Sequence, residues 1–240
     1  MCSVASLTSF LAIPFNFIYM VEEIKNYKTI LPSGLVVRNT IAADAEQLEE
    51  LQHIVFPNLS DEEILHAPQY IRHTEIFPEG QFVITDSGRI VAATTTMRYH
   101  YNENDTSHHT FFDIMGGGWL TTHDPHGEWM YGLDMGVHPG YRGKGLAKEL
   151  YKVRHHTCRL IGLAGQMTVG MLNGYIKHKD AMTIDAYYEK VKSGELFDPT
   201  VSVQAKIGFK IKGLMKDYLN DPTCGNAGAL IVLDVNTPIP

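Results

Sequence analysis

The chain has 240 residues and a formal net charge of −7, and its Lys and Arg residues form no basic stripe or cluster. This charge argues against a general nucleic-acid-binding protein and is compatible with cationic substrates such as amines. The length suits one domain with insertions or an extension, and 44% hydrophobic residues with both charge signs is ordinary for a globular protein.

Residues 1–34 are predicted to form an N-terminal extension to a single domain of residues 35–240. The apolar run from Val4 to Val21 is short for a membrane span and is interrupted by Pro14 and Asn16. No positive charge precedes it, as a secretory signal would require. The three cysteines are far apart and form no CxxC pair, which favours reduced thiols. We therefore expect a cytoplasmic protein without membrane attachment.

The first predicted elements of the domain are a strand and two helical segments. Leu35–Arg38 is apolar enough for a strand, and Thr40 is expected to cap a helix that runs from Ala42 to His53. Ser60 and Glu63 have the spacing of a capping box, which predicts the start of a second helical segment there.

A β-hairpin is predicted next, followed by a long polar loop. Two strands, Gln81–Thr85 and Arg89–Tyr99, flank a turn at Asp86-Ser87-Gly88. Residues 101–127 are rich in histidine and glycine, and loops of this length are often functional. His123 and His126 invite a metal interpretation, but Pro125 and Gly127 make a helical pair of ligands unfavourable, so we predict no metal site.

Met130–Leu160 is the most informative stretch of the chain. An apolar run from Met130 to Val137 is stopped by Pro139-Gly140, and a glycine-spaced turn, Arg142–Gly145, follows. Apolar residues then recur at helical spacing from Leu146 onward. The pattern predicts a strand, a tight loop and an amphipathic helix that begins in the loop.

This order of elements favours anion binding. The first N–H groups of a helix are unpaired and carry the positive end of the peptide dipoles, and glycines let the backbone approach a ligand closely. Arg142 and Lys144 add positive charge at the same place. A Walker loop is excluded because Gly145, rather than Ser or Thr, follows Lys144, and a dinucleotide fingerprint fails because Lys148 occupies its third glycine position.

What fits is Val137-x-Pro139-x-x-Arg142-Gly143-x-Gly145-x-Ala147. This pattern resembles the acyl-CoA-binding motif of the GNAT superfamily of N-acyltransferases, whose core is Arg/Gln-x-x-Gly-x-Gly/Ala. The stretches THDPHGEWMYG and DPTVSVQAKIGF are also similar to a GNAT subgroup that is sometimes fused to a carbon–nitrogen hydrolase domain, and a separate hydrolase partner is left open.

The remaining elements complete the order expected of that superfamily. The predicted elements are a strand at Gln166–Met171, a helix at Thr183–Lys192, a helix started by Asp198-Pro199 and ended by Gly208, and strands at Phe209–Met215 and Ala229–Val235. The resemblance thus implies an α/β (α+β) fold with a mixed, mostly antiparallel central sheet flanked by helices. Residues 172–197 are an insertion relative to compact members.

The resemblance also implies a reaction and a co-substrate. An acetyl or other acyl group would pass directly from acyl-CoA to a primary amine of a small molecule or peptide. Loop residues Arg142, Gly143, Lys144, Gly145, Leu146 and Ala147 would bind the pyrophosphate. Met135, Gly136 and Val137 would pair with the pantetheine, and a backbone N–H there would stabilise the oxyanion.

The acid and the base of such a reaction are less well defined. Asp134 is the first candidate for the base because it is out of step with the apolar alternation of its strand, and Glu128 is the second. The tyrosine that the family often uses as general acid is replaced by Gln204, so Tyr188 or Tyr187 of the insertion is expected to substitute for it. His66, Tyr70 and His73 fall in the helices that usually form a wall of the acceptor site.

Three functions remain in competition at this point. The first is N-acyl transfer, with acyl-CoA as co-substrate, no metal, and either a monomer or a homodimer as the assembly. The second is a catalytically weak acyl-CoA-binding or sensing module that assists a partner, which the replaced tyrosine favours. Metal-dependent hydrolysis by the histidine-rich loop is the third and the least supported by the pattern.

Overall fold

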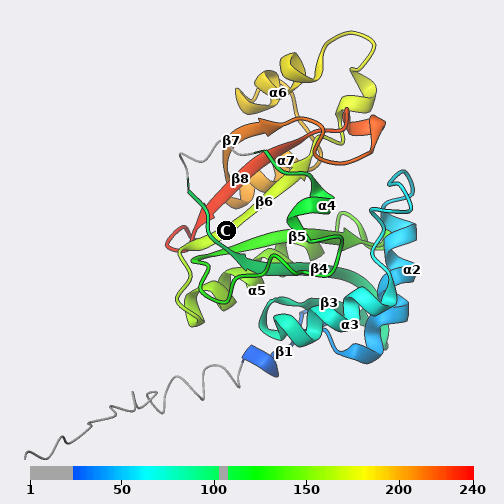
Figure 1. Cartoon of the computed structure of the whole chain (residues 1–240), viewed down its shortest axis with the longest axis vertical. Coiled ribbons are helices and arrows are strands. Elements are labelled where there is room, and N and C mark those ends of the chain that lie inside the picture. Colours follow the sequence, from blue (N-terminus) through cyan, green and yellow to red (C-terminus); the bar gives the residue numbers. More distant parts are fainter. Residues whose placement is uncertain (1–23, 103–107) are drawn as a thin grey trace, which may run out of the picture.

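The computed structural model describes residues 24–102 and 108–240, and its core is one mixed sheet (Figure 1). The strands are ordered β1-β2-β3-β4-β5-β6-β8-β7, with β5 and β6 parallel and the other neighbouring strands antiparallel. Their bounds are β1 (Lys28–Ile30), β2 (Val36–Asn39), β3 (Phe82–Asp86), β4 (Arg89–Tyr99), β5 (Trp129–Val137), β6 (Gly165–Met171), β7 (Lys210–Met215) and β8 (Gly228–Asp234). The predicted fold class is confirmed.

Helices cover both faces of the sheet. Their bounds are α2 (Ala45–Val55), α3 (Ala67–Ile76), α4 (Phe111–Ile114), α5 (Leu146–Leu160), α6 (Ile184–Lys192) and α7 (Val201–Ile207). β3 shows the division of its faces, because Val83 packs in the cluster of α2 and α3 whereas Phe82 and Ile84 pack against α5. A strand buried on both faces reads as a continuous apolar run, as β3 does.

Two local predictions were wrong near the N-terminal helices. The residues after Thr40 form a short 3-10 turn (Ala42–Asp44) before α2 begins, and Ile41 rather than Thr40 is its cap. Ser60 and Glu63 do interact, but they start no helix, and α3 begins only at Ala67. The Glu63 carboxylate instead accepts the backbone N–H of Asn220 at 3.0 Å, so the apparent capping box anchors a distant loop.

The predicted extension contains a strand that the sequence pattern did not indicate. β1 pairs antiparallel with β2 at the edge of the sheet, with Thr29 opposite Val37. The apolar run Val4 to Val21 lies outside the described residues. Within the described part of the chain, no helix is both long and apolar enough to cross a membrane. The predicted domain boundary at residue 35 and the predicted cytoplasmic location both stay predictions.

β5 carries an irregularity that fixes the direction of its side chains. Its pairing with β4 is shifted between Thr95 and Thr96, so that Thr95 lies opposite Asp134 whereas Thr96 lies opposite Gly132. Leu133 is therefore the extra residue of a β-bulge. Beyond the bulge, Asp134 faces α2 and α3, and Met135 packs with the α5 cluster.

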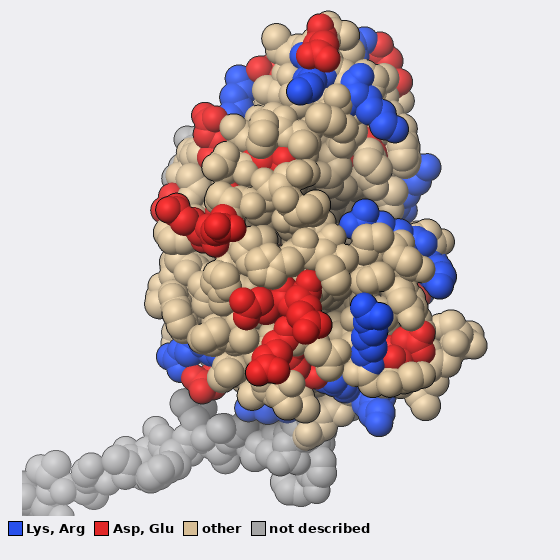
Figure 2. Space-filling view, turned by 90° about the vertical axis from the view of Figure 1, so that its right-hand side faces the viewer, with Lys and Arg blue, Asp and Glu red and all other residues tan. Residues whose placement is uncertain are grey.

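One side of the molecule carries a patch of acidic side chains. Figure 2 views the side on which α2 lies, and Asp and Glu side chains gather in the middle of it. The exposed acidic residues of α2 and of the segment that follows it are Glu46, Glu50, Asp61 and Glu62.

Candidate functional site

β5 and β6 stop pairing with each other in the middle of the sheet. They pair in parallel from Trp129 opposite Gly165 to Gly132 opposite Thr168, and the hydroxyl of Thr168 donates to the carbonyl of Gly132 at 2.6 Å. Beyond that pair β5 stays with β4 and β6 stays with β8, so the two strands run on without pairing with each other. We call this point the strand divergence. The predicted pantetheine-binding residues Met135, Gly136 and Val137 lie on β5 just beyond it.

The predicted phosphate loop leads from the end of β5 to α5 and is exposed. Gly143 and Gly145 have φ of +76° and +80°, the left-handed region that favours glycine. A Cβ at either position would have nothing within 4 Å, so the glycines serve backbone conformation and open access rather than internal packing. Arg142 Nε donates to the carbonyl of Val137 at 3.1 Å, and Lys144 Nζ lies 4.5 Å from the centre of the Tyr141 ring.

The backbone N–H groups of this loop differ in their pairing: that of Arg142 donates to the carbonyl of Pro139 at 3.2 Å, whereas those that follow it are free. Gly145 is the N-cap of α5 and supplies no side-chain acceptor. Within residues 24–102 and 108–240, no acceptor receives the N–H of Gly143, Lys144, Gly145, Leu146 or Ala147. A helix start with free N–H groups, preceded by an exposed loop that carries Arg142 and Lys144, is suited to bind an anion such as a pyrophosphate.

The side chain of Asp134 lies on the face of β5 opposite to α5, where it is buried beneath α2 and α3. Its carboxylate accepts a hydrogen bond of 2.6 Å from Gln52 Nε2, and the hydroxyl of Tyr70 lies 3.4 Å away. Burial raises the pKa of Asp134 from 3.8 to about 7, outweighing the hydrogen bonds from Tyr70 and Gln52, which lower it. A carboxyl group with such a pKa can take and return a proton near neutral pH.

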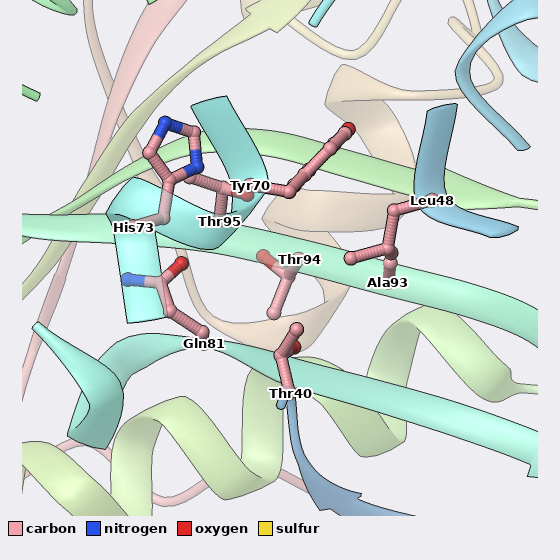
Figure 3. Close-up of a pocket in the computed structure, with 8 residues that line it drawn as sticks. All are labelled: Thr40, Leu48, Tyr70, His73, Gln81, Ala93, Thr94 and Thr95. Carbon is pink, nitrogen blue, oxygen red and sulfur yellow. The ribbon is translucent and has the colours of Figure 1, made fainter. Parts of the chain in front are cut away.

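A narrow hollow lies between the two N-terminal helices and the sheet (Figure 3). Tyr70 lines both this hollow and the one that contains Asp134. His73 also lines this hollow, with Nε2 2.7 Å from the carbonyl of Gly118 and with Nδ1 buried and without a partner among the described residues. Burial lowers the pKa of His73 to about 4, so the ring is neutral at pH 7. Of the three predicted wall residues, only Tyr70 reaches Asp134, and His66 lies at the surface beside Glu49.

Glu128, the second predicted base, is not near Asp134. It precedes β5 at the other end of the strand, is exposed, and pairs with His100 at 2.5 Å. That hydrogen bond lowers the pKa of Glu128. The structure therefore does not bring Glu128 to the strand divergence, and its assignment as a base stays an unsupported prediction.

The tyrosines of the insertion are buried against the far end of the sheet. The helix predicted at Thr183–Lys192 is α6, with Thr183 as its N-cap, and α6 packs near β7 (Figure 1). The hydroxyl of Tyr187 donates to Asp198 at 3.0 Å, and Asp198 also accepts the N–H groups of Thr200 and Val201 at the start of α7. Tyr188 shares a core cluster with Tyr151, and its buried hydroxyl has no partner among the described residues.

A polar cluster flanks the strand divergence on the α5 face, and the sequence pattern did not identify it. Gln204 Nε2 donates to the hydroxyl of Tyr151 at 2.7 Å, and the Arg154 guanidinium lies 5.2 Å from the Tyr151 ring centre. Gly132 and Gly170 provide the room, because a Cβ there would lie 2.0 Å from Arg154 Nη2 and 2.3 Å from Gln204 Oε1. The sequence did contain an indication of this cluster. Arg154 follows Leu150 by four residues, so it places a charge on the apolar stripe of the helix.

The histidine-rich loop has a structural part in the fold. His123 Nδ1 accepts the N–H of Arg98 at 3.1 Å, and its ring packs on Phe77 at 5.1 Å between centres. Across the described residues, no three His, Cys, Asp or Glu side chains converge as metal ligands. The absence of a metal from the protein's function stays a prediction.

Comparisons with known proteins bear on the same elements. The model of the acetyltransferase (GNAT) family matches residues 45–173, which include α2, the strand divergence and the phosphate loop. The chain is 33% identical over 189 residues to the probable hydrolase YhcX of Bacillus subtilis, a match that covers 79% of this chain but 36% of that protein. It is 29% identical over 199 residues to the uncharacterized N-acetyltransferase YkwB of the same organism, covering 82% of this chain and 88% of the relative.

Solved structures share the fold of this chain. The GphF GNAT-like decarboxylase in complex with isobutyryl-CoA superposes with a TM-score of 0.71 at 20% identity, covering 83% of this chain and 99% of that one. The loading GNATL domain of CurA from Lyngbya majuscula gives 0.70 at 21% identity, covering 88% and 98%. On the family match over residues 45–173, which is more than half of its length, the chain belongs to the acetyltransferase (GNAT) family.

Proposed function

We propose that this protein is an acyl-CoA-dependent N-acyltransferase that moves an acetyl or other acyl group to a primary amine of a small molecule or peptide. The observation that carries the proposal is the set of backbone N–H groups from Gly143 to Ala147, which have no acceptor among the described residues and begin in the exposed loop before α5. In a family that binds acyl-CoA, these groups are the natural hydrogen-bond donors to the pyrophosphate. Met135, Gly136 and Val137 would then hold the pantetheine beside the strand divergence.

Asp134 is the best-supported base. An amine must lose a proton to act as a nucleophile, and a carboxyl group whose pKa is raised to about 7 is matched to that task. The acidic side of the molecule, on which α2 lies, would attract a cationic amine toward the same face of β5 (Figure 2). Because the side chains of Gln52 and Tyr70 enclose the carboxylate, one of them must move away before an amine can reach Asp134.

Tyr151 is a candidate for the general acid that the sequence left unassigned. Gln204 occupies the position at which the family often has tyrosine, and its amide donates to the Tyr151 hydroxyl. Because that bond uses an oxygen lone pair, the phenolic proton stays available for a leaving thiolate. Burial raises the pKa of Tyr151, and the neighbouring Arg154 charge lowers it.

The direct test measures release of free CoA from acetyl-CoA with a panel of amines, with mass analysis of the amine products. Acyl transfer predicts an amine-dependent release of CoA that Gly145→Glu abolishes, since a carboxylate would occupy the phosphate site. An activity that this substitution leaves unchanged would refute the proposal.

A second candidate is an acyl-CoA-binding module with weak or no transfer activity. The enclosure of Asp134 and the replacement of the usual tyrosine by Gln204 favour it. Tight CoA binding in calorimetry, with no turnover on any amine, would select this candidate. One solved structure of similar fold is described as a decarboxylase, so the assay should also follow loss of carbon dioxide from malonyl-CoA.

A further inference from the structure

Arg154 is a buried cation without a counter-ion. Its side chain is 1% exposed, and its Nε and Nη2 atoms have no hydrogen-bond partner among the described residues. Across the same residues, no Asp or Glu oxygen lies within 4.0 Å of it. Its close neighbour is the face of the Tyr151 ring, 5.2 Å from Cζ to the ring centre.

An unpaired guanidinium in this position is costly. A buried charge loses several kcal/mol of solvation unless a partner compensates it, and native proteins almost always supply one. The unused donors Nε and Nη2 lie in the fork geometry that fits a carboxylate. The local arrangement therefore indicates an anion that binds from outside the chain.

The guanidinium lies at the strand divergence. It covers Gly132, the last residue of β5 that pairs with β6. Across the divergence, Gln204 Oε1 covers Gly170 of β6 and has no donor among the described residues. The two side chains thus place unused donors and an unused acceptor over neighbouring strands on the α5 face.

The position of the guanidinium along β5 indicates which part of a ligand would meet Arg154. The guanidinium covers Gly132, which lies five residues before Val137 and therefore about 16 Å from the loop end of the strand. Tyr151 lies on α5 between the phosphate loop and Arg154. If the pantetheine of a bound acyl-CoA follows this length of β5, as proposed, the acyl group beyond its sulfur would reach Arg154.

We infer that the preferred acyl donor is the CoA thioester of a dicarboxylic acid, whose free carboxylate pairs with Arg154. The inference rests on the proposed acyl-CoA site and adds the substrate class. Arg154 donates to the carboxylate through Nε and Nη2, and Gly132 leaves room for the guanidinium against the strand.

The test compares anionic and neutral acyl chains of matched shape. Calorimetry compares the affinity for malonyl-CoA with that for isovaleryl-CoA, and the affinity for succinyl-CoA with that for 4-methylpentanoyl-CoA. Free CoA is the reference, because its contacts are common to all four thioesters. We expect the wild-type protein to bind each anionic thioester about tenfold or more tightly than its neutral match. Arg154→Met should remove or reverse this preference and leave the affinity for free CoA within about twofold of wild type.

Matched controls separate the inference from the proposed function. Arg159→Met removes an exposed arginine of the same helix and should keep the preference. Equal binding of anionic and neutral thioesters by the wild type, or an unchanged preference in Arg154→Met, overturns the inference while CoA binding still supports the site. Loss of free-CoA binding by Arg154→Met also overturns it, because the guanidinium would then serve the cofactor. Absence of CoA binding by the wild type overturns the proposed function as well.

Discussion

The side-chain amide of Gln52 on α2 donates a 2.6 Å hydrogen bond to the carboxylate of Asp134 on β5. This bond joins the helix that carries much of the acidic surface to the strand that passes the divergence. It also compensates only part of the cost of burying the carboxylate, since the pKa of Asp134 is still raised to about 7. Asp134 is therefore both a source of instability near neutral pH and the best candidate for a proton acceptor.

Asp134→Asn should change how stability depends on pH. Between an unfolded pKa near 3.8 and a folded pKa of about 7, the native carboxyl holds a proton that the unfolded one has lost. The stability of the wild type relative to the variant should thus fall as pH rises from about 4 to 7, by an amount on the order of 4 kcal/mol. Denaturant unfolding at fixed pH values measures this difference. A difference that stays constant over the range would show that Asp134 has an ordinary pKa.

The same group should shape the pH profile of turnover. If Asp134 accepts the amine proton, kcat/KM of the wild type rises with pH up to about 7 beyond any rise caused by the amine itself. The ratio of wild-type to Asp134→Asn rates isolates this contribution, because the titration of the amine is common to both. A ratio that is flat from pH 5 to 8 would contradict the assignment of Asp134 as base.

Gly145→Glu and Gly162→Glu form a matched pair for the phosphate loop. Both glycines have positive φ, +80° and +73°, and a Cβ at either would meet nothing within 4 Å. Each substitution should therefore cost about 1–2 kcal/mol of backbone strain in thermal or denaturant unfolding. Only Gly145→Glu, at the N-terminus of α5, should abolish CoA binding in calorimetry. Equal loss of binding in both variants would point to general destabilisation instead.

The phosphate loop could be predicted because its requirements are local. Positive φ at Gly143 and Gly145 and an apolar stripe that starts at Leu146 are properties of neighbouring residues, and the sequence displays them directly. The hairpin around Ser87-Gly88 was predictable for the same reason, since both turn residues have positive φ. The first strand of the sheet was missed because Lys28–Ile30 is exposed and carries no apolar alternation.

The surroundings of the site could not be predicted because they depend on long-range packing. The partners of Asp134 are Gln52 and Tyr70, which are 82 and 64 residues away in the chain. Gln204 and Tyr151 are hydrogen-bonded although they are 53 residues apart in the chain, and nothing in either residue type predicts that the two are in contact. The Ser60–Glu63 pair shows the opposite error, because a locally convincing capping box was overridden by the contact of Glu63 with Asn220.

Tyr151→Phe and Tyr188→Phe distinguish the two candidate acids. If the Tyr151 hydroxyl protonates the thiolate, Tyr151→Phe should lower kcat by about 100-fold with little change in the KM for acyl-CoA. Tyr188→Phe removes a buried hydroxyl that has no described partner, so it should leave stability unchanged or slightly raised. Steady-state kinetics measure kcat and KM of both variants, and thermal unfolding measures their stability. A loss of kcat in Tyr188→Phe alone would assign the acid to the insertion.

Gly132→Ala tests whether Arg154 occupies the divergence in solution. A Cβ at residue 132 would lie 2.0 Å from Nη2 and 2.4 Å from Nη1 of Arg154, so the guanidinium must move. We expect Gly132→Ala to destabilise the wild type by about 1–3 kcal/mol, the usual cost of overpacking. In an Arg154→Ala background the same substitution should cost much less, and the difference is the coupling energy of the two sites. Chemical denaturation of the two single variants and the double variant measures this cycle. Additive effects would mean that the guanidinium does not lie against Gly132 and so cannot hold a carboxylate at that position.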